Sequence, residues 1–382
     1  MNDPPAKTED VVSGVFEASG ESGGHLRNPD VGYQVRPGDI VVPAVLRRTM
    51  GLRGGEMVVG RAKPGSRSAR GRARELAHVE SINGRSPEHH LDSRPFEDLT
   101  AVDPGRHLQF ETSSGSLSMR IVDLMTPIGF GQRGLIVAPP RTGKTILLQQ
   151  MADGIATNHP DAHLIVLLVD ERPEEVTDMR RKVRGEVAAS SNDKAADSHI
   201  RLTRVVIEKA KRLVEGGQDV VILLDSLTRL GRAFNTTIKG SRRIMSGGLD
   251  AAALNEPKGI FGAARNVEEG GSLTIVASAL IETGSRMDEV IFNEFKGTGN
   301  MEIMLSREMA NKRLWPAIDL NLSGTRKEER LLTPEALEVA HKIRRTLSGK
   351  DPSRAMELLL QSLERFPSNS DFIQHYAERP LR

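Results

Sequence analysis

The chain has no cysteine, few aromatic residues and no long apolar run. Zero cysteines in 382 residues exclude disulfides, thiol catalysis and thiolate metal sites, and fit a cytoplasmic protein. No stretch reaches the ~18 apolar residues that span a membrane. The polar beginning, MNDPPAKTED, lacks the apolar core of a signal peptide. With 38% hydrophobic and 27% charged residues, the composition is that of a globular protein large enough for two or three domains.

The formal net charge of +2 conceals an uneven distribution. Residues 1–44 carry three basic and seven acidic side chains, a net of −4, whereas residues 45–75 carry nine basic and two acidic ones, a net of +7. The segment KPGSRSARGRAR (63–74) is too poor in apolar residues to pack as an element. We therefore predict a mobile basic loop that can follow a phosphate backbone. The alternative is a solvated loop that only aids solubility.

Changes in hydrophobic pattern divide the chain into four parts. Residues 1–10 form a polar leader, and residues 11–84 hold short β-like runs between Gly, Pro and Asn turns, which predicts a small barrel. Residues 85–120 are a turn-rich connector. Residues 121–382 form the second domain, whose last part, 333–382, is helical again.

The second domain has the pattern of an α/β fold. Four apolar runs are expected to be strands buried on both faces: 135–140, 164–170, 220–226 and 272–280. Helix-like stretches lie between them, at 143–156 and 202–216. Strands that alternate with helices predict a mostly parallel sheet covered on both faces.

The most specific local signal is a phosphate-binding loop, APPRTGKT (138–145). It follows an apolar strand and opens a helix, the context that a Walker A loop requires, although Ala138 replaces the usual first glycine. We expect Lys144 to contact the β- and γ-phosphates of ATP and Thr145 to ligate Mg²⁺. The alternative is a chance strand–turn–helix. The expected nucleotide-binding residues are Pro139, Pro140, Arg141, Thr142, Gly143, Lys144, Thr145 and Ile146.

Carboxylates at the ends of two apolar strands are candidates for the same site, because open sheets bind ligands at the carboxyl ends of their strands. Asp225 ends VVILLD and is expected to hold the Mg²⁺ shell. Asp170 and Glu171 end LIVLLV, and Glu171 is a candidate general base for the attacking water. Arg172 is either a γ-phosphate sensor or an ordinary surface arginine. The alternative for the carboxylates is that they cap the next helix.

These residues resemble one family closely, the bacterial transcription termination factors Rho. The resemblance extends through nearly all of residues 121–330, and Ala138 is the residue that the family carries. The matching stretches are GQRGLIVAPPRTGKT (131–145), VDERPEEVTDMRR (169–181), VVILLDSLTRLGRAFN (220–235), FGAARNVEEGGSLTI (261–275), MDEVIFNEFKGTGNMEIMLSRE (287–308) and WPAIDLNLSGTRKEE (315–329).

The resemblance implies a RecA-like P-loop motor preceded by an OB-type, cold-shock-like barrel. It implies a cytoplasmic homohexameric ring that uses ATP and Mg²⁺ to move 5′-to-3′ along single-stranded RNA, as a helicase that releases the nascent transcript from RNA polymerase. Arg326 matches an arginine finger that reaches the neighbouring subunit's nucleotide, and Arg313 matches a second trans-acting arginine. Trp315 matches an aromatic that lies against adenine; without the resemblance it would be a core or interface residue.

Two loops match the family's RNA-binding pore loops. The first, TTIKGSRRIMSGG (236–248), has Arg243, Ile244 and Ser246 at RNA-facing positions, and the second has Arg286 in place of a usual lysine. Without the resemblance each would be a solvent loop.

The barrel matches the family over residues 25–64, with candidate RNA contacts at His25 and Arg27. The aromatics that stack RNA bases are missing, because their positions fall on Gly23, His25 and Val41; each lost stack costs about 1–3 kcal/mol. Tyr33 is a possible substitute. The family's helical bundle, which precedes the barrel, is also expected to be missing.

Three functions follow from these observations. The first is an active RNA-dependent ATPase that ends transcription, which the complete motor motifs favour. The second is a Rho-like RNA-binding regulatory ATPase that does not itself terminate transcription, which the altered barrel favours. The third, a RecA-like motor that acts on DNA or protein, is disfavoured by the pore-loop match.

Overall fold

The computed structural model describes residues 10–20, 22–68, 71–113, 115–238 and 244–377. Within that part of the chain, no helix is both long enough and apolar enough to span a membrane. The chain divides into two compact units, and each is described by itself. Unit 1 comprises Met1–Leu99 and Arg201–Gln218, and unit 2 comprises Thr100–Ile200 and Asp219–Arg382.

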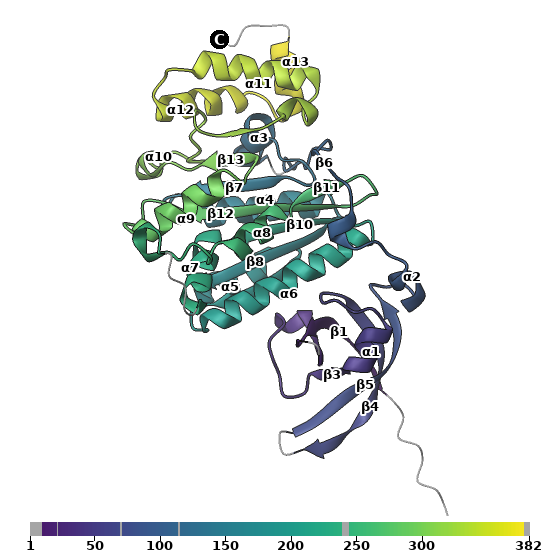
Figure 1. The fold of residues 1–382 in the computed structure, drawn as a ribbon. Helices are drawn as coiled ribbons and strands as arrows, with labels where there is room; N and C mark the ends of the chain where they lie inside the picture. The colour runs from purple at the N-terminus through teal and green to yellow at the C-terminus, as the bar shows by residue number, and fades with distance from the viewer. Residues whose placement is uncertain (1–9, 21, 69–70, 114, 239–243, 378–382) are drawn as a thin grey trace, which may run out of the picture. The chain divides into compact units, whose positions relative to one another are not determined.

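Unit 1 contains a closed five-stranded barrel in the order β1-β2-β3-β5-β4 (Figure 1), which confirms the predicted barrel. Its strands are β1 (Asp10–Ala18), β2 (Gly23–Arg27), β3 (Ile40–Pro43), β4 (Met57–Ser68) and β5 (Gly71–Ile82). Alternate residues point inward, so Phe16, Val42 and Val58 are fully buried in its core. Short helices follow the strands: η1 (Pro29–Val31), α1 (Ala44–Thr49), α2 (Pro87–Leu91) and η2 (Phe96–Asp98).

The basic segment 63–74 is not the loop that its composition predicts. Its described residues lie on β4 and β5, which pair as antiparallel strands beyond the barrel, with Lys63 opposite Glu75 and Arg67 opposite Arg72. The backbone ladder continues because its hydrogen bonds need no apolar side chain, so composition is a weak guide to strand formation here.

The second part of unit 1 is the C-terminal portion of helix α6 (Ala196–Glu215). The Arg201 guanidinium donates to Glu17, with Nη1 3.0 Å from Oε2, and Lys209 Nζ donates to the Tyr33 hydroxyl at 3.2 Å. Tyr33 is fully buried. The ring of Tyr33 therefore packs inside the unit and does not replace the missing stacking aromatics.

Unit 2 is built on a sheet in the order β14-β13-β7-β12-β10-β8-β9, with β11 and β6 added beside β12. Neighbours from β13 to β9 run parallel, and all four predicted strands are present. Consecutive residues Val220–Asp225 are all buried, as expected of a strand covered on both faces. The strands are β6 (Ala101–Val102), β7 (Arg133–Ala138), β8 (His163–Glu171), β9 (Glu186–Ser191), β10 (Asp219–Asp225), β11 (Arg265–Val267), β12 (Ser272–Leu280), β13 (Met301–Met304) and β14 (Gly324–Thr325).

Helices connect and cover these strands (Figure 1). The helices of unit 2 besides α6 are α3 (Leu117–Met125), α4 (Lys144–Asn158), α5 (Pro173–Lys182), α7 (Leu227–Thr237), η3 (Ser246–Gly248), α8 (Asn255–Gly262), α9 (Arg286–Lys296), α10 (Arg307–Asn311), η4 (Glu328–Arg330), α11 (Pro334–Leu347), α12 (Pro352–Leu363) and α13 (Asn369–Ala377).

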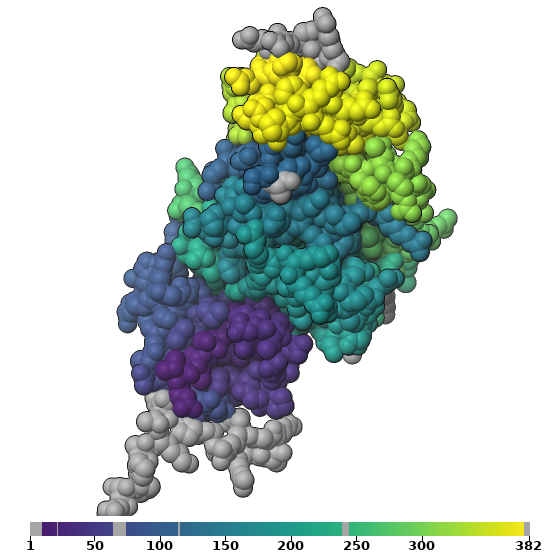
Figure 2. Space-filling model, turned by 180° about the vertical axis from the view of Figure 1, so that it is seen from behind, coloured from purple at the N-terminus to yellow at the C-terminus, as the bar shows by residue number. Residues whose placement is uncertain are grey.

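The structure confirms that the described part of 333–382 is helical, and side chains cap the first two helices of this segment. Thr333 accepts from the Ala336 amide at 3.2 Å at the start of α11, and Asp351 accepts from the Arg354 amide at 3.1 Å at the start of α12. Figure 2 shows these helices, in yellow, gathered at one end of unit 2 over the blue segment that contains α3.

The connector, residues 85–120, has more structure than its turn-rich sequence indicates. It contributes α2 and η2 to unit 1, and in unit 2 β6 pairs with β11 to extend the sheet. Apolar anchors hold it down, since Phe96 in unit 1 and Phe110 in unit 2 are both buried.

Candidate nucleotide and RNA sites

The loop between β7 and α4 has the geometry of a phosphate cradle. Arg141 and Gly143 adopt left-handed backbone conformations, with φ of 66° and 81°, and the Thr142 hydroxyl donates to the Pro139 carbonyl at 2.7 Å. Helix α4 begins at Lys144 with no side chain capping its first amides. Free N–H groups at a helix N-terminus are a ready site for phosphate oxygens.

Three charged side chains converge on this loop, because the carboxyl ends of parallel strands meet at one edge of the sheet. Lys144 Nζ donates to Asp225 at the end of β10 and lies 3.5 Å from Oε1 of Glu171 at the end of β8. Ser278 on β12 donates to Asp225 at 2.7 Å. Burial lowers the pKa of Lys144, but the two carboxylates outweigh this effect and raise it, so the ammonium stays charged.

The Glu171 carboxyl has an unusual proton affinity. Burial and the nearby charge of Asp225 raise its pKa to about 7, against the partial opposition of Lys144 and Arg229. Glu171 is 2% exposed. A carboxyl with a pKa near neutrality is suited to accept a proton from water at physiological pH.

Arg229 is a site residue that the sequence analysis did not single out. Its Nε lies 3.3 Å from Oε1 of Glu171, and its Nη1 donates to the carbonyl of Asp170. It lies on α7, one turn after Asp225, within the matching stretch 220–235. Its only sequence signal was that position, since a lone arginine on a helix is usually on the surface.

A cavity of about 280 Å³ adjoins the phosphate loop, lined by residues that include Gly143, Ile146 and Trp315. A Cβ on Gly143 would lie 2.8 Å from the Trp315 ring, so the ring lies directly over the loop. Trp315 is 43% exposed and Ile146 is 61% exposed. An exposed aromatic face beside a phosphate cradle suits a nucleobase.

The oxygen ligands near the loop fit Mg²⁺. Thr145 stands in the first turn of α4, and Asp225 presents a buried carboxylate from the adjacent strand end. Mg²⁺ is held in nucleotide sites by one or two protein oxygens together with substrate phosphates. A hydroxyl and a carboxylate supply that donor set.

Arg326 lies at the opposite edge of the sheet from the phosphate loop. It follows β14, whose Thr325 pairs with Met301 at the start of β13, and Met301 pairs with Gly134 near the start of β7. The phosphate loop follows the end of β7. A strand rises ~3.3 Å per residue, so roughly 13 Å of strand separate the two edges. Arg326 is exposed, and its backbone lies at the end of the sheet remote from its own chain's nucleotide loop.

The two other candidate arginines are also exposed. Arg172 is the N-cap residue of α5, directly after Glu171. Arg313 has a left-handed backbone, with φ of 60°, two residues before Trp315. Both therefore border the nucleotide site in sequence, and neither takes part in the Lys144 cluster.

The two candidate RNA loops lie against each other. A Cβ on Gly247 would lie 2.6 Å from the Met287 amide nitrogen, so the described end of the first loop packs on the start of α9, where Arg286 is exposed. Ile244 is 73% exposed, and Ser246 begins η3. Arg243 lies outside the described residues. The second loop follows β12 directly, and the first loop is joined to β10 through helix α7.

Arg232 and Asp288 join the helices that carry these loops. Arg232 on α7 donates from Nε to Asp288 on α9 at 2.7 Å, and Thr283 also donates to Asp288, at 2.6 Å. Asp288 is fully buried. A buried carboxylate with several donors holds the two loops in a fixed relation.

The three barrel positions at which the family stacks RNA bases lie on described strands, and none of them carries a Phe, Tyr or Trp. His25 pairs with Val41 and Gly23 with Pro43, so the three expected positions are neighbours on β2 and β3. Gly23 has φ of 104°, and a Cβ there would collide with the Val42 carbonyl, so no aromatic fits. Burial lowers the pKa of His25 and Arg27 lowers it further, which keeps the ring neutral.

Arg27, the other candidate RNA contact, is paired with carboxylates of the barrel. It is 6% exposed and forms ion pairs with Glu17 and Asp39. A guanidinium paired with two carboxylates offers little charge to a phosphate, so its role in the structure is to hold β2.

Comparisons with known proteins match both units. Residues 12–88 match the RNA-binding domain of the Rho termination factor, and residues 118–325 match the nucleotide-binding domain of the ATP synthase alpha/beta family. Two solved structures have a similar fold. One is a prototypical ATPase from the type III secretion system of pathogenic bacteria, with a TM-score of 0.60 and 20% identity over 75% of this chain and 84% of that chain. The other is the ATP synthase subunit NeqB from Nanoarcheaum equitans, with a TM-score of 0.57 and 18% identity over 73% of this chain and 76% of that chain.

Curated relatives are far more similar in sequence. Transcription termination factor Rho of Escherichia coli (strain K12) is 51% identical over 96% of this chain and 88% of its own length, and that of Cereibacter sphaeroides is 51% identical over 94% and 85%. Rho of Streptomyces lividans is 52% identical over 90% of this chain and 48% of its own length. The chain spans about half the length of this relative and of the one from Micrococcus luteus. The chain belongs to the family of Rho transcription termination factors.

Proposed function

We propose that the chain is an RNA-dependent ATPase that assembles into a hexameric ring in the cytoplasm. The ring moves 5′-to-3′ along single-stranded nascent RNA, as a helicase, and releases the transcript from RNA polymerase. The observation that carries the proposal is the packing of Gly247 against Met287, because it brings together two loops that lead from strands of the nucleotide site, one directly from β12 and one from β10 through helix α7.

The side chains of the nucleotide site have separate roles in this proposal. Lys144 exchanges Asp225 for the β- and γ-phosphates of ATP, and Glu171 accepts a proton from the attacking water. Thr145 and Asp225 would hold Mg²⁺, which would neutralise charge on the phosphates. Trp315 stacks on adenine, and Arg172 contacts the γ-phosphate.

The ring is part of the proposal because Arg326 lies at the end of the sheet remote from its own chain's nucleotide loop. The opposite-edge position suits an arginine that stabilises the γ-phosphate of a neighbouring subunit, with Arg313 as a second contribution from that neighbour. Such a finger is worth roughly 10³–10⁵ in kcat.

RNA contacts in this proposal come from the loops rather than from base stacking in the barrel. The proposed RNA contacts are Ile244, Ser246 and Arg286, which are all exposed, and Arg243, which lies outside the described residues. The missing barrel rings support a second candidate, a Rho-like regulatory ATPase that binds RNA without ending transcription. In vitro transcription distinguishes the two candidates by the release of shortened transcripts.

The experiment is the steady-state ATPase rate with and without RNA for the wild type, Arg326→Ala and Arg330→Ala. Arg330 is a matched control because it is an exposed arginine four residues away, 3.0 Å from Asp103. We expect RNA to stimulate the wild type and Arg330→Ala, and Arg326→Ala to lose about 10³-fold or more. Absence of RNA stimulation in the wild type contradicts the RNA-dependent mechanism, and full activity of Arg326→Ala contradicts the finger.

A further inference from the structure

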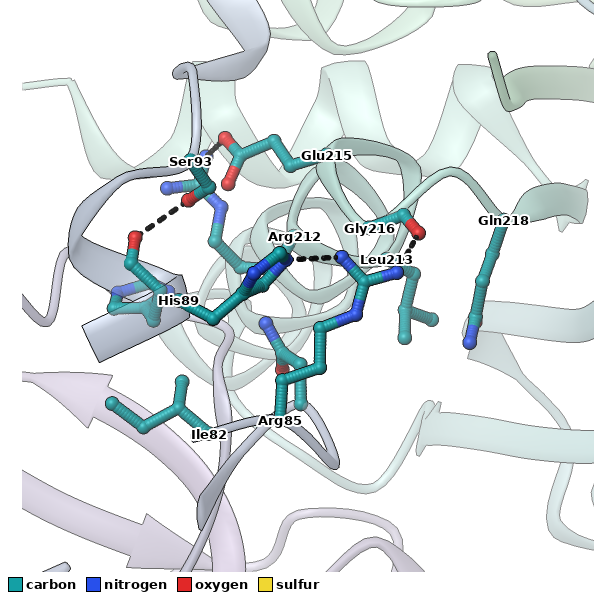
Figure 3. A pocket seen from close by; sticks show the side chains of 11 residues that line it. Ile82, Arg85, His89, Ser93, Arg212, Leu213, Glu215, Gly216 and Gln218 are labelled. Carbon is teal, nitrogen blue, oxygen red and sulfur yellow. Dashed lines mark hydrogen bonds and ion pairs between the residues drawn. The ribbon is translucent and has the colours of Figure 1, made fainter. Parts of the chain in front are cut away.

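Unit 1 contains a small cavity that none of the functions above uses. It lies between the turn after β5, helix α2 and the C-terminal end of α6, and its volume is about 40 Å³ (Figure 3). Roughly 10–15 Å³ is needed for one water, so the cavity has room for about three waters or one tetrahedral oxyanion. Its polar lining includes Arg85, His89, Arg212, Glu215 and Gln218.

Arg212 presents an unused donor at this cavity. The side chain is 2% exposed, and its Nη2 lies 3.1 Å from Oε1 of Glu215. Its Nε–H donates to no acceptor among the described residues. A buried guanidinium donor without an acceptor is costly, and such a group commonly marks the place of a bound water or ion.

Arg85 adds a second guanidinium on the other side of the cavity. Its Nη1 lies 2.7 Å from Nε2 of His89, and its Nη2 donates to the Gly216 carbonyl at 2.7 Å. These two contacts orient the planar group, as Figure 3 shows, and neither partner is a carboxylate. A guanidinium carries five N–H donors, so three remain for another acceptor.

The carboxylate of Glu215 does not neutralise both arginines. It is already bound by Arg53, with Nη1 3.0 Å from Oε1, by the Phe96 amide at 2.7 Å and by Arg212. Arg53 and Arg212 therefore share the charge of Glu215, while Glu208, 3.6 Å from Arg212, is itself paired with Lys211 at 2.8 Å. The lining of the cavity holds two arginines, Arg85 and Arg212, against the single carboxylate of Glu215, so the lining carries a net positive charge.

We propose that this cavity binds the oxyanion of a phosphate group, held by Arg85 and by the Nε–H of Arg212. Guanidinium groups match the geometry of phosphate oxygens, and the size of the cavity admits a single such group. The phosphate has two possible sources: free inorganic phosphate, or a phosphate of an RNA chain.

The test is equilibrium dialysis of the full chain with radiolabelled inorganic phosphate, in the presence of a saturating non-hydrolysable ATP analogue that fills the nucleotide site. We expect one phosphate per chain, with affinity reduced about tenfold or more by Arg85→Gln and by Arg212→Lys, which keeps the charge but removes the Nε–H. Arg36→Gln is the matched control. It removes the same charge from an exposed position of unit 1 outside the cavity lining, and it should change affinity less than twofold.

Competitors identify the source. Displacement of phosphate by a 5′-phosphorylated RNA oligonucleotide but not by its 5′-hydroxyl form indicates a terminal phosphate of RNA. Displacement by both indicates an internal phosphodiester, and displacement by neither indicates free phosphate; all three support the site. The proposal is overturned if the chain binds no labelled phosphate while the ATP analogue fills the nucleotide site, because the cavity then holds water alone. It is also overturned if Arg36→Gln weakens binding as much as Arg85→Gln.

Discussion

Replacement of Arg229 by glutamine is expected to move the acid limb of the ATPase pH profile to higher pH. Glu171 acts as a base only when it is ionised, so activity rises as pH increases through its pKa of about 7. The positive charge of Arg229 favours the ionised carboxylate. Removal of that charge raises the pKa, and a larger fraction of Glu171 is then protonated and inactive at neutral pH.

The distance sets the size of this shift. Arg229 Nε lies 3.3 Å from Glu171 Oε1. At an effective dielectric constant of ~20, two unit charges at that distance interact by about 5 kcal/mol. The Arg229 side chain is 24% exposed and also contacts Asp170, so screening and sharing reduce the effect. The expected rise in the pKa of Glu171 is about 1–2 units.

The assay is kcat/KM for ATP at saturating RNA between pH 5.5 and ~9.5, because this parameter reports the pKa values of the free enzyme. The wild type should have its half-maximum near the pKa of about 7, and Arg229→Gln should have it near pH ~8 or above. Arg184→Gln is the control, since this exposed arginine pairs with Asp153 instead of Glu171. An unshifted limb in Arg229→Gln, or an equal shift in the control, refutes the assignment of Glu171 as the titrating base.

Two further predictions concern the RNA loops and the nucleobase. Gly247→Ala places a Cβ 2.6 Å from the Met287 amide nitrogen at a φ of 76°, so the two RNA loops should separate. The stimulation of the ATPase rate by RNA should then fall about tenfold, while the rate without RNA stays within twofold. An unchanged stimulation by RNA contradicts the coupling between the loops and the nucleotide site. Trp315→Ala should raise the KM for ATP about tenfold with little change in kcat, because stacking acts equally on bound substrate and transition state. The fluorescence of Trp315, the single tryptophan, should change on nucleotide binding, and a silent titration argues against stacking.

The nucleotide site was largely predictable because its parts are local in sequence. Strand, loop and helix follow one another from β7 to α4, and parallel strands bring Glu171 and Asp225 to the same edge. The spacing could not reveal Arg229 or Ser278, since their roles depend on which strand and helix pack beside the loop. The raised pKa of Glu171 likewise comes from burial, which no spacing reports.

The roles of the barrel residues were harder to predict, because they too depend on tertiary packing. Segment 63–74 looked like a loop by composition but continues a strand ladder. Tyr33 and Arg27 looked available for RNA, yet the structure buries one ring and pairs the other side chain with two carboxylates. Exposure depends on contacts between segments distant in sequence, and a residue's type does not fix it.

The sequence by itself determined the fold class, the P-loop and the family resemblance, because these depend on short-range periodicity and contiguous strings. Only the tertiary structure decided that Arg326 lies at the end of the sheet remote from its own nucleotide loop and that Gly247 packs against Met287. Sheet order and loop packing join residues far apart in the chain, and their geometry is set by the packing of the whole domain. The few aromatics and the small net charge thus describe what the chain contains, and the structure determines which of those groups are exposed.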